Sequence, residues 1–214
     1  MNFLAHSVLG FDDDALVAGQ IAGDFVRGTD LSALGARAAL GARLHRAIDA
    51  RTDAHPALAA LRRRVPAPLR RFAGVALDIG LDHVIARTWP RAAVAALEAG
   101  PLPVRRPPAA DLHEHAERVG AALEGAAPRL PEPVLRFAPH LVRTMPRWAD
   151  PEGVAATLER LSRRSPRWAP LARTPAELER LDGALEGALE ALWPELLGHA
   201  RDMLVHHGAR GDRR

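Results

Sequence analysis

The pattern of apolar and polar positions is helical along the whole chain. Ala, Leu and Arg, which are good helix formers, dominate, and period-two runs of β-branched and aromatic residues are missing. The pattern predicts helices over residues 14–27, 31–53, 56–64, 68–88, 90–99, 109–125, 131–147, 151–164 and 174–206. We therefore predict an all-α fold, a single compact multi-helix domain.

Several helix boundaries have a physical basis, and the length fits one domain. Asp30 and Ser32 can cap the helix that follows them, and Thr174 to Glu177 is typical of a capping box. With 214 residues, the chain can bury a substantial core, so we expect one domain over residues 1–214. The Pro and Arg content of residues 101–108 predicts an exposed connection. Residues 207–214 are expected to form a mobile tail.

Two acidic residues interrupt the helix predicted over residues 68–88, which is otherwise apolar nearly all round and so typical of a buried helix. The four-residue spacing of Asp78 and Asp82 places both carboxylates on one face of this helix. A buried carboxylate is costly or becomes protonated unless a positive group compensates. Either a divalent metal or buried pairs with arginine would do so, and both interpretations stay open.

A second polar row lies on the helix predicted over residues 31–53. His45, Asp49 and Asp53 recur every four residues and border an apolar stripe, so His45 and Asp49 project side by side. An imidazole and a carboxylate one turn apart can ligate one metal. The alternative is an ordinary charge-assisted pair at a helix surface.

Two more polar residues, His6 and Asp24, lie among apolar neighbours. Each alone could be a buried polar group that is fully hydrogen-bonded. Together with the two previous features they form a set of His and Asp ligands without a thiolate. Such a set suits Mn²⁺ or Mg²⁺ better than structural zinc, and it supports hydrolysis at phosphorus.

Composition removes several other kinds of chemistry. The absence of Cys excludes disulfides, thiolate zinc sites, iron–sulfur clusters and a cysteine nucleophile, and the absence of Lys and Tyr excludes a Schiff-base lysine, a Walker-type phosphate loop and a tyrosine acid. All 29 basic side chains are Arg, yet the net charge is only +3. The computed pI near 10.9 is high because little titrates between His and Arg. We therefore expect no nucleic-acid partner.

Charge is distributed unevenly along the chain. Residues 35–91 contain eleven Arg against four Asp, with the densest block at residues 62–64 and 70–71. This block is either a solvated helix face or a docking patch for an acidic partner. Neither a signal peptide nor a membrane-spanning segment is apparent, so we expect a cytoplasmic protein without a membrane partner.

Four motifs resemble the acyl carrier protein phosphodiesterase family. They are residues 1–6 (MNFLAH), 23–28 (GDFVRG), 44–53 (LHRAIDARTD) and 77–83 (LDIGLDH), in the expected order. The resemblance covers most of residues 1–90, is weak over 92–147, and returns loosely at 161–164 and in the last helix.

The resemblance implies an HD-phosphohydrolase-like all-helical fold with a divalent metal, usually manganese. It also implies cleavage of the phosphodiester that joins 4′-phosphopantetheine to the serine of holo acyl carrier protein. The chain lacks an adjacent His-Asp pair and has Asp82-His83 in the reverse order. The implied metal contacts are His6, Asp24, His45 and Asp78. The residues implied to orient water or support the ligands are Asp49, Asp82 and His83.

The implied partner also gives the arginines a role. Arg27 and Arg46 would bind phosphate, while Arg63 and Arg70 would help dock a small, strongly acidic carrier protein. Two alternatives remain open from the residues. One is a metal-dependent phosphohydrolase of a nucleotide or another small phosphoester, and the other is a non-catalytic helical protein that binds an acidic partner through its Arg face.

Overall fold

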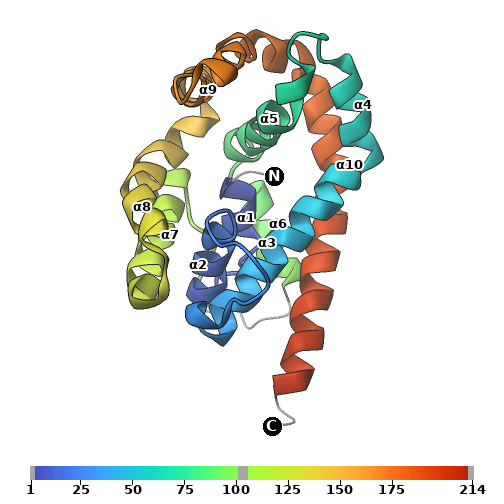
Figure 1. Cartoon of the computed structure of the whole chain (residues 1–214). Coiled ribbons are helices and arrows are strands. Elements are labelled where there is room, and N and C mark those ends of the chain that lie inside the picture. The colour runs from blue at the N-terminus through green and yellow to red at the C-terminus, as the bar shows by residue number, and fades with distance from the viewer. Residues whose placement is uncertain (1–2, 101–105, 212–214) are drawn as a thin grey trace.

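The computed structural model describes residues 3–100 and 106–211, and all the regular elements of these residues are helices (Figure 1). The prediction of an all-α fold is confirmed. The α-helices are α1 (Phe3–Val8), α2 (Asp14–Ala22), α3 (Ala36–Ala54), α4 (Pro56–Arg64), α5 (Ala73–Arg87), α6 (Arg91–Ala99), α7 (Leu112–Ala126), α8 (Glu132–Thr144), α9 (Pro151–Ser162) and α10 (Pro175–Gly211). The 3₁₀ turns are η1 (Ser32–Leu34), η2 (Arg70–Phe72), η3 (Ala127–Arg129), η4 (Met145–Ala149) and η5 (Pro166–Arg173).

The structure differs from the predicted boundaries at both ends of the chain. Helix α1 was not predicted, because six residues are too few to display helical periodicity. Helix α3 begins later than residue 31, because Gly35 adopts a φ of +75° and separates η1 from α3. The Asp30 carboxylate accepts from the Ser32 amide, 2.9 Å away, at the start of η1. Helix α10 continues through residues 207–211, and the rest of the predicted tail lies outside the described residues.

The predicted connection over residues 101–108 is described only in its last part. Residues 101–105 lie outside the described ranges, whereas Pro107 is exposed. Arg106 is half-buried, because its guanidinium and amide donate to the Asp12 side chain in the turn before α2.

The helices form layers around α1 and α5. Helix α10 runs down one side of the molecule and packs against α3, α4 and α5, while α7 and α8 lie on the opposite side (Figure 1). Helix α5 is buried over most of its length, as its apolar sequence predicted. Helices α2 and α3 approach closely at Gly19, where a Cβ atom would lie 2.0 Å from the Ala38 carbonyl oxygen. Among the helices that the structure describes, we find none long and apolar enough to cross a membrane.

Asp82 fastens α1 to α5. Its two carboxylate oxygens accept from the amides of Leu4 and Ala5, at 2.8 and 3.1 Å, and its side chain is buried. These amides belong to the first turn of α1, where a helix has no internal acceptors for its N–H groups. Asp82 therefore sets the position of the short helix that carries His6.

Replacing Asp82 with Ala is expected to lower the free energy of unfolding by about 2 kcal/mol or more, because two buried N–H groups lose their acceptor. Asp82→Asn retains one acceptor oxygen and should cost less. Urea unfolding of the two variants and the wild type measures the difference. Equal stability of Asp82→Ala and the wild type would refute this role.

Candidate functional site

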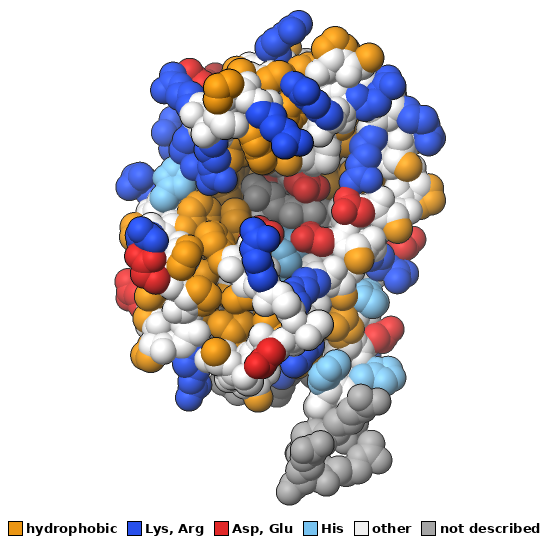
Figure 2. Space-filling model, in the orientation of Figure 1, with side chains coloured by type: hydrophobic (Ala, Val, Ile, Leu, Met, Phe, Trp, Pro, Cys, Tyr) orange, Lys and Arg blue, Asp and Glu red, His pale blue; other side chains and the backbone are white. Residues whose placement is uncertain are grey.

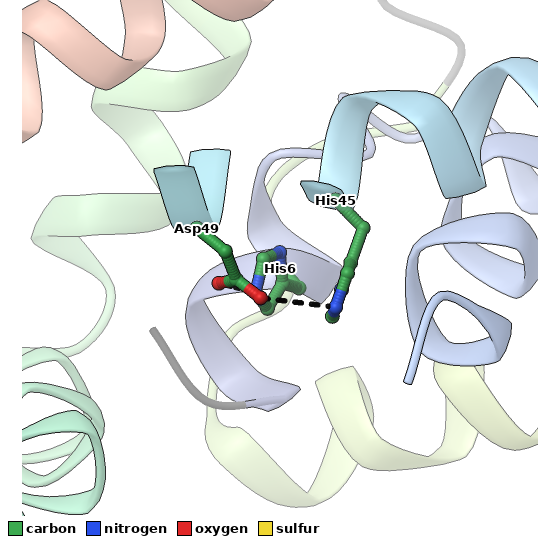
Figure 3. A group of neighbouring side chains, drawn as sticks. All are labelled: His6, His45 and Asp49. Atoms are coloured by element: carbon green, nitrogen blue, oxygen red, sulfur yellow. Dashed lines mark hydrogen bonds and ion pairs between the residues drawn. The ribbon is translucent and has the colours of Figure 1, made fainter. Parts of the chain in front are cut away.

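His6, His45 and Asp49 form a compact cluster where α1 meets α3 (Figure 3). The His6 Nε2 atom lies 3.0 Å from Asp49 Oδ1, and His45 Nε2 lies 3.2 Å from Asp49 Oδ2. The two imidazole rings stack with their centroids 4.0 Å apart. The pair His45 and Asp49 is one helical turn apart, as its spacing predicted, whereas His6 reaches the pair from a different helix.

Asp24 joins the cluster from the turn that follows α2. One of its carboxylate oxygens lies 3.3 Å from His45 Nε2. Gly23 allows this approach, because a Cβ atom at that position would lie 2.4 Å from Cγ of His45. Arg46 holds the same turn against α3 by donating to the backbone carbonyls of Gly28 and Val26, at 2.6 and 3.0 Å.

Burial and hydrogen bonds shift the titration of the three clustered residues. Burial, with the nearby charge of His45, lowers the pKa of His6 to about 4. Burial also opposes the charged form of His45, but the hydrogen-bonded carboxylates of Asp24 and Asp49 outweigh it and raise its pKa to about 9. Burial would raise the pKa of Asp49, but hydrogen bonds from His45 and His6 hold it well below its usual range. The cluster therefore favours an ionised Asp49 carboxylate.

The hydrogen bonds of His6 indicate that a cation fits between His6 and Asp49. His6 Nδ1 lies 3.0 Å from Gln20 Oε1, and Nε2 lies 3.0 Å from Asp49 Oδ1, so each ring nitrogen faces an oxygen acceptor. Since the lowered pKa of His6 leaves its ring neutral near pH 7, the ring carries one N–H and can donate to only one of these two acceptors at a time. The other ring nitrogen and the oxygen that it faces are then two acceptors, which repel at this distance unless a positive charge lies between them. Two imidazoles and a carboxylate, with ligand atoms all within 4.8 Å of one another, can supply three ligands to one divalent ion.

Gln20 completes this arrangement as a support for His6. Metal-ligating histidines commonly donate their second ring N–H to a protein acceptor, which fixes the tautomer and the orientation of the ring. Gln20 is fully buried on α2 and provides that acceptor. Sequence reasoning did not identify Gln20, since a single Gln inside an apolar helix carries no motif.

A cleft of about 430 Å³ opens beside the cluster. One wall bears the carboxylates of Asp24, Asp49 and Asp78, and the facing elements α8 and α9 contribute His140 and Arg160. Figure 2 shows acidic side chains gathered in a hollow on this face, with arginine side chains around its upper rim. The cleft thus combines an acidic wall with a basic one.

The predicted pair Asp78 and Asp82 is divided between two environments. Asp78 lines the cleft, and burial, with the charges of Asp49 and Asp53, raises its pKa. Asp82 instead caps α1, and burial raises its pKa to about 7 although the two backbone amides act in the opposite direction. Of the two carboxylates only Asp78 lines the cleft, so a metal contact stays a prediction for Asp78 alone.

The remaining predicted residues lie outside the cleft. His83 Nδ1 lies 2.7 Å from the Trp148 carbonyl oxygen and links α5 to η4. Arg27 is exposed in the turn after α2, and Arg63 and Arg70 are exposed on α4 and η2. Their roles in orienting water, binding phosphate and docking a partner stay predictions.

The second half of the chain contributes cleft residues that sequence reasoning missed. They are charged or aromatic and come from α8, η4, η5 and the region around α9: Phe137, His140, Trp148, Arg160, Arg164 and Trp168. Only Arg164 falls within the stretch that loosely matched the motifs. The others are spread over separate elements, so no spacing in the sequence could group them.

Comparison with known proteins places the cluster in a matched region. Residues 1–100 match the family model described as acyl carrier protein phosphodiesterase. This chain is similar to that family over its first hundred residues. The resemblance found in the four motifs is thereby confirmed, and the matched region contains His6, Asp24, His45, Asp49 and Asp78.

Curated relatives of the acyl carrier protein phosphodiesterases give the same picture. The chain is 38% identical over 89 residues to the protein of that name from Photorhabdus laumondii, a match that covers 42% of this chain and 45% of the relative. The proteins of the same name from Pectobacterium atrosepticum and Escherichia coli O139:H28 are 37% and 35% identical over 89 residues, with 42% of this chain and 46% of each relative covered. The match thus spans less than half the length of these relatives. No solved structure matches the chain.

Proposed function

We propose that the cleft is the active site of a metal-dependent phosphodiesterase that hydrolyses the 4′-phosphopantetheine–serine phosphodiester of holo acyl carrier protein. The observation that carries the proposal is the cluster of His6, His45 and Asp49 beside the cleft, within the residues similar to the acyl carrier protein phosphodiesterases. In the reaction, the oxygen of water bonds to phosphorus, the bond from phosphorus to the serine oxygen breaks, and the serine oxygen receives a proton. The products are apo carrier protein and 4′-phosphopantetheine.

In this proposal the chain's own residues hold the ion and keep its ligands ordered. His6, His45 and Asp49 would hold a divalent cation, and the Asp24 and Asp78 carboxylates in the same cleft would supply further oxygen ligands. When bound, the cation activates a water molecule and neutralises charge on the phosphoryl oxygens. The mixed imidazole and carboxylate ligands favour Mn²⁺, with Mg²⁺ as the second choice. Gln20 and Gly23 keep the two imidazoles in place.

The proposal is tested by incubating the protein with holo carrier protein and Mn²⁺ and measuring the mass of the carrier. The expected result is loss of the phosphopantetheine group, which a chelator prevents. Hydrolysis of small phosphoesters without any change in the carrier would favour the small-substrate phosphohydrolase. Failure to bind metal or to hydrolyse either substrate would favour a non-catalytic protein. A cytoplasmic location stays part of the proposal.

The partner is supported by charge complementarity. Arg63 on α4 and Arg70 on η2 are exposed, and they belong to the arginine-rich block over residues 62–71. An acidic carrier protein would be steered to such a surface before its prosthetic group enters the cleft.

Reversing both charges, Arg63→Glu with Arg70→Glu, is expected to raise KM for holo carrier protein by roughly tenfold while kcat changes little. The reason is that docking is weakened while the cleft is untouched. Steady-state kinetics at varied carrier concentration measures the effect. A matched control reverses two other exposed arginines, Arg43 and Arg201, and keeps the net charge equal. If both double variants show the same KM, the block is not the docking surface.

A further inference from the structure

We propose that Arg160 and Arg164 form the phosphate-binding wall of the cleft, opposite the cluster of His6, His45 and Asp49. They would hold the non-bridging oxygens of the phosphodiester. The inference rests on the proposed function for the identity of the substrate, whereas the binding of a phosphate group can be tested without it. It assigns a role in the reaction to the half of the chain outside the match with known relatives.

The two arginines lie at the C-terminal end of α9 and in the turn that follows it. Arg160 lies in the last turn of α9, Arg164 lies in the turn after it, and both side chains line the same cleft. Within the part of the chain that the structure describes, no carboxylate forms an ion pair with either of them. By contrast, the intervening Arg163 points elsewhere and pairs with Glu159 at 2.6 Å. The cleft-lining arginines therefore have guanidinium groups available for an external anion.

The electrostatics of the basic wall also favour an anion. Burial, together with the neighbouring Arg164 guanidinium, lowers the pKa of Arg160. His140 on α8 faces the same charges, since burial and the guanidinium groups of Arg160, Arg143 and Arg164 all lower its pKa. Like charges gathered without a counter-ion are relieved by a bound anion. Guanidinium groups match a phosphate well because their N–H groups can donate two parallel hydrogen bonds.

The acidic wall explains why this basic wall is needed. Asp24, Asp49 and Asp78 line the same cleft and would repel a phosphodiester. A divalent ion held among them offsets part of that repulsion, and the arginines attract the anion from the opposite side. A phosphodiester would then be held between the acidic wall and the two guanidinium groups.

The cleft also has an apolar wall that suits an organic ester. Phe137 on α8 packs against Phe3 and Phe25, with ring centroids 4.9 and 5.5 Å away, and all three line the cleft. Trp168 on η5 lines it too and packs against Phe72. A substrate with an uncharged chain beside its phosphate fits this combination better than a bare inorganic anion.

The two arginines fit this role better than those expected from the sequence. The guanidinium group of Arg46 donates to two backbone carbonyls of the segment after α2, and Arg46 does not line the cleft. Arg27 lies in that turn and is exposed rather than cleft-lining. Arg160 and Arg164, in contrast, face the cleft directly.

The test compares a double variant, which carries both Arg160→Ala and Arg164→Ala, with the control variant Arg163→Ala. Binding of inorganic phosphate is measured by calorimetry in the presence of Mg²⁺, and hydrolysis of holo carrier protein is measured with Mn²⁺. We expect the double variant to bind phosphate at least tenfold more weakly and to lose roughly 10²-fold in kcat/KM. Arg163→Ala should match the wild type, and Mn²⁺ affinity should be unchanged in both variants.

Each outcome decides the inference separately from the proposed function. If the double variant keeps wild-type phosphate affinity and kcat/KM, the inference is overturned while carrier hydrolysis by the wild type still supports the function. If the wild type binds phosphate through these arginines but leaves holo carrier intact, the phosphate site stands and the proposed substrate is wrong. Failure of the wild type to bind phosphate overturns the inference. A second double variant, Arg160→Lys with Arg164→Lys, keeps both positive charges and should bind phosphate more tightly than the double Ala variant. A purely structural role of the two arginines does not predict this recovery.

Discussion

Replacing Asp49 with Ala is expected to lower the hydrolysis of holo carrier protein by roughly 10³-fold or more and to weaken Mn²⁺ binding strongly. Its two carboxylate oxygens contact the Nε2 atoms of both His6 and His45, so no other residue of the cluster joins the two imidazoles. Its side chain is 36% exposed, which lets the carboxylate face the cleft while the histidines stay buried. Calorimetry with Mn²⁺ and carrier-protein mass analysis measure the two effects.

Asp53 offers a matched control one turn further along α3. It carries the same charge but is more exposed and pairs with Arg62 outside the cleft. Asp53→Ala should therefore keep wild-type Mn²⁺ affinity and turnover. If Asp49→Ala binds Mn²⁺ as tightly as Asp53→Ala does, the cluster is not the metal site, and a charge-assisted network of His and Asp becomes the better description.

Replacing Gly23 with Ala is expected to reduce kcat/KM by roughly 10²-fold through displacement of His45. The backbone of Gly23 is helical, with φ −52° and ψ −38°, so an alanine is allowed there by its dihedral angles. The effect comes from the added methyl group alone, which would lie 2.4 Å from Cγ of the imidazole. Since His45 is held by two carboxylates, a shift of its ring also disturbs Asp24 and Asp49.

The control for this substitution is Gly183→Ala on α10. A Cβ atom at Gly183 meets nothing within 4 Å, so alanine there should preserve activity and stabilise the helix by about 0.5–1 kcal/mol. Kinetics, Mn²⁺ affinity and thermal unfolding of both variants separate displacement of His45 from general destabilisation. An active Gly23→Ala protein with wild-type metal affinity would show that the close contact has no functional importance.

The helical spacing of residues made part of the site predictable. The four-residue interval of His45 and Asp49 places them on one face of a helix, and the distance of 3.2 Å between them agrees with that expectation. The apolar composition of residues 68–88 predicted the burial of α5. Because a carboxylate is unusual in such a helix, Asp78 was predicted to belong to the site, and it lines the cleft. In each case the informative contacts lie within one helix, where geometry follows directly from sequence separation.

The tertiary structure decided which residues from different helices meet. The residue pattern within α1 does not reveal that His6 stacks on His45. The pattern within α5 does not reveal that Asp82 caps α1 while Asp78 faces the cleft. Such patterns also could not group Arg160 and Arg164 with a cluster more than a hundred positions earlier. Helix periodicity specifies the face on which a side chain lies, but the neighbour of that face depends on packing of distant segments. For this protein, the sequence alone determined an all-helical chain with candidate ligands on known faces, and only the packing of α1, α3, α5 and α9 brought them to one cleft.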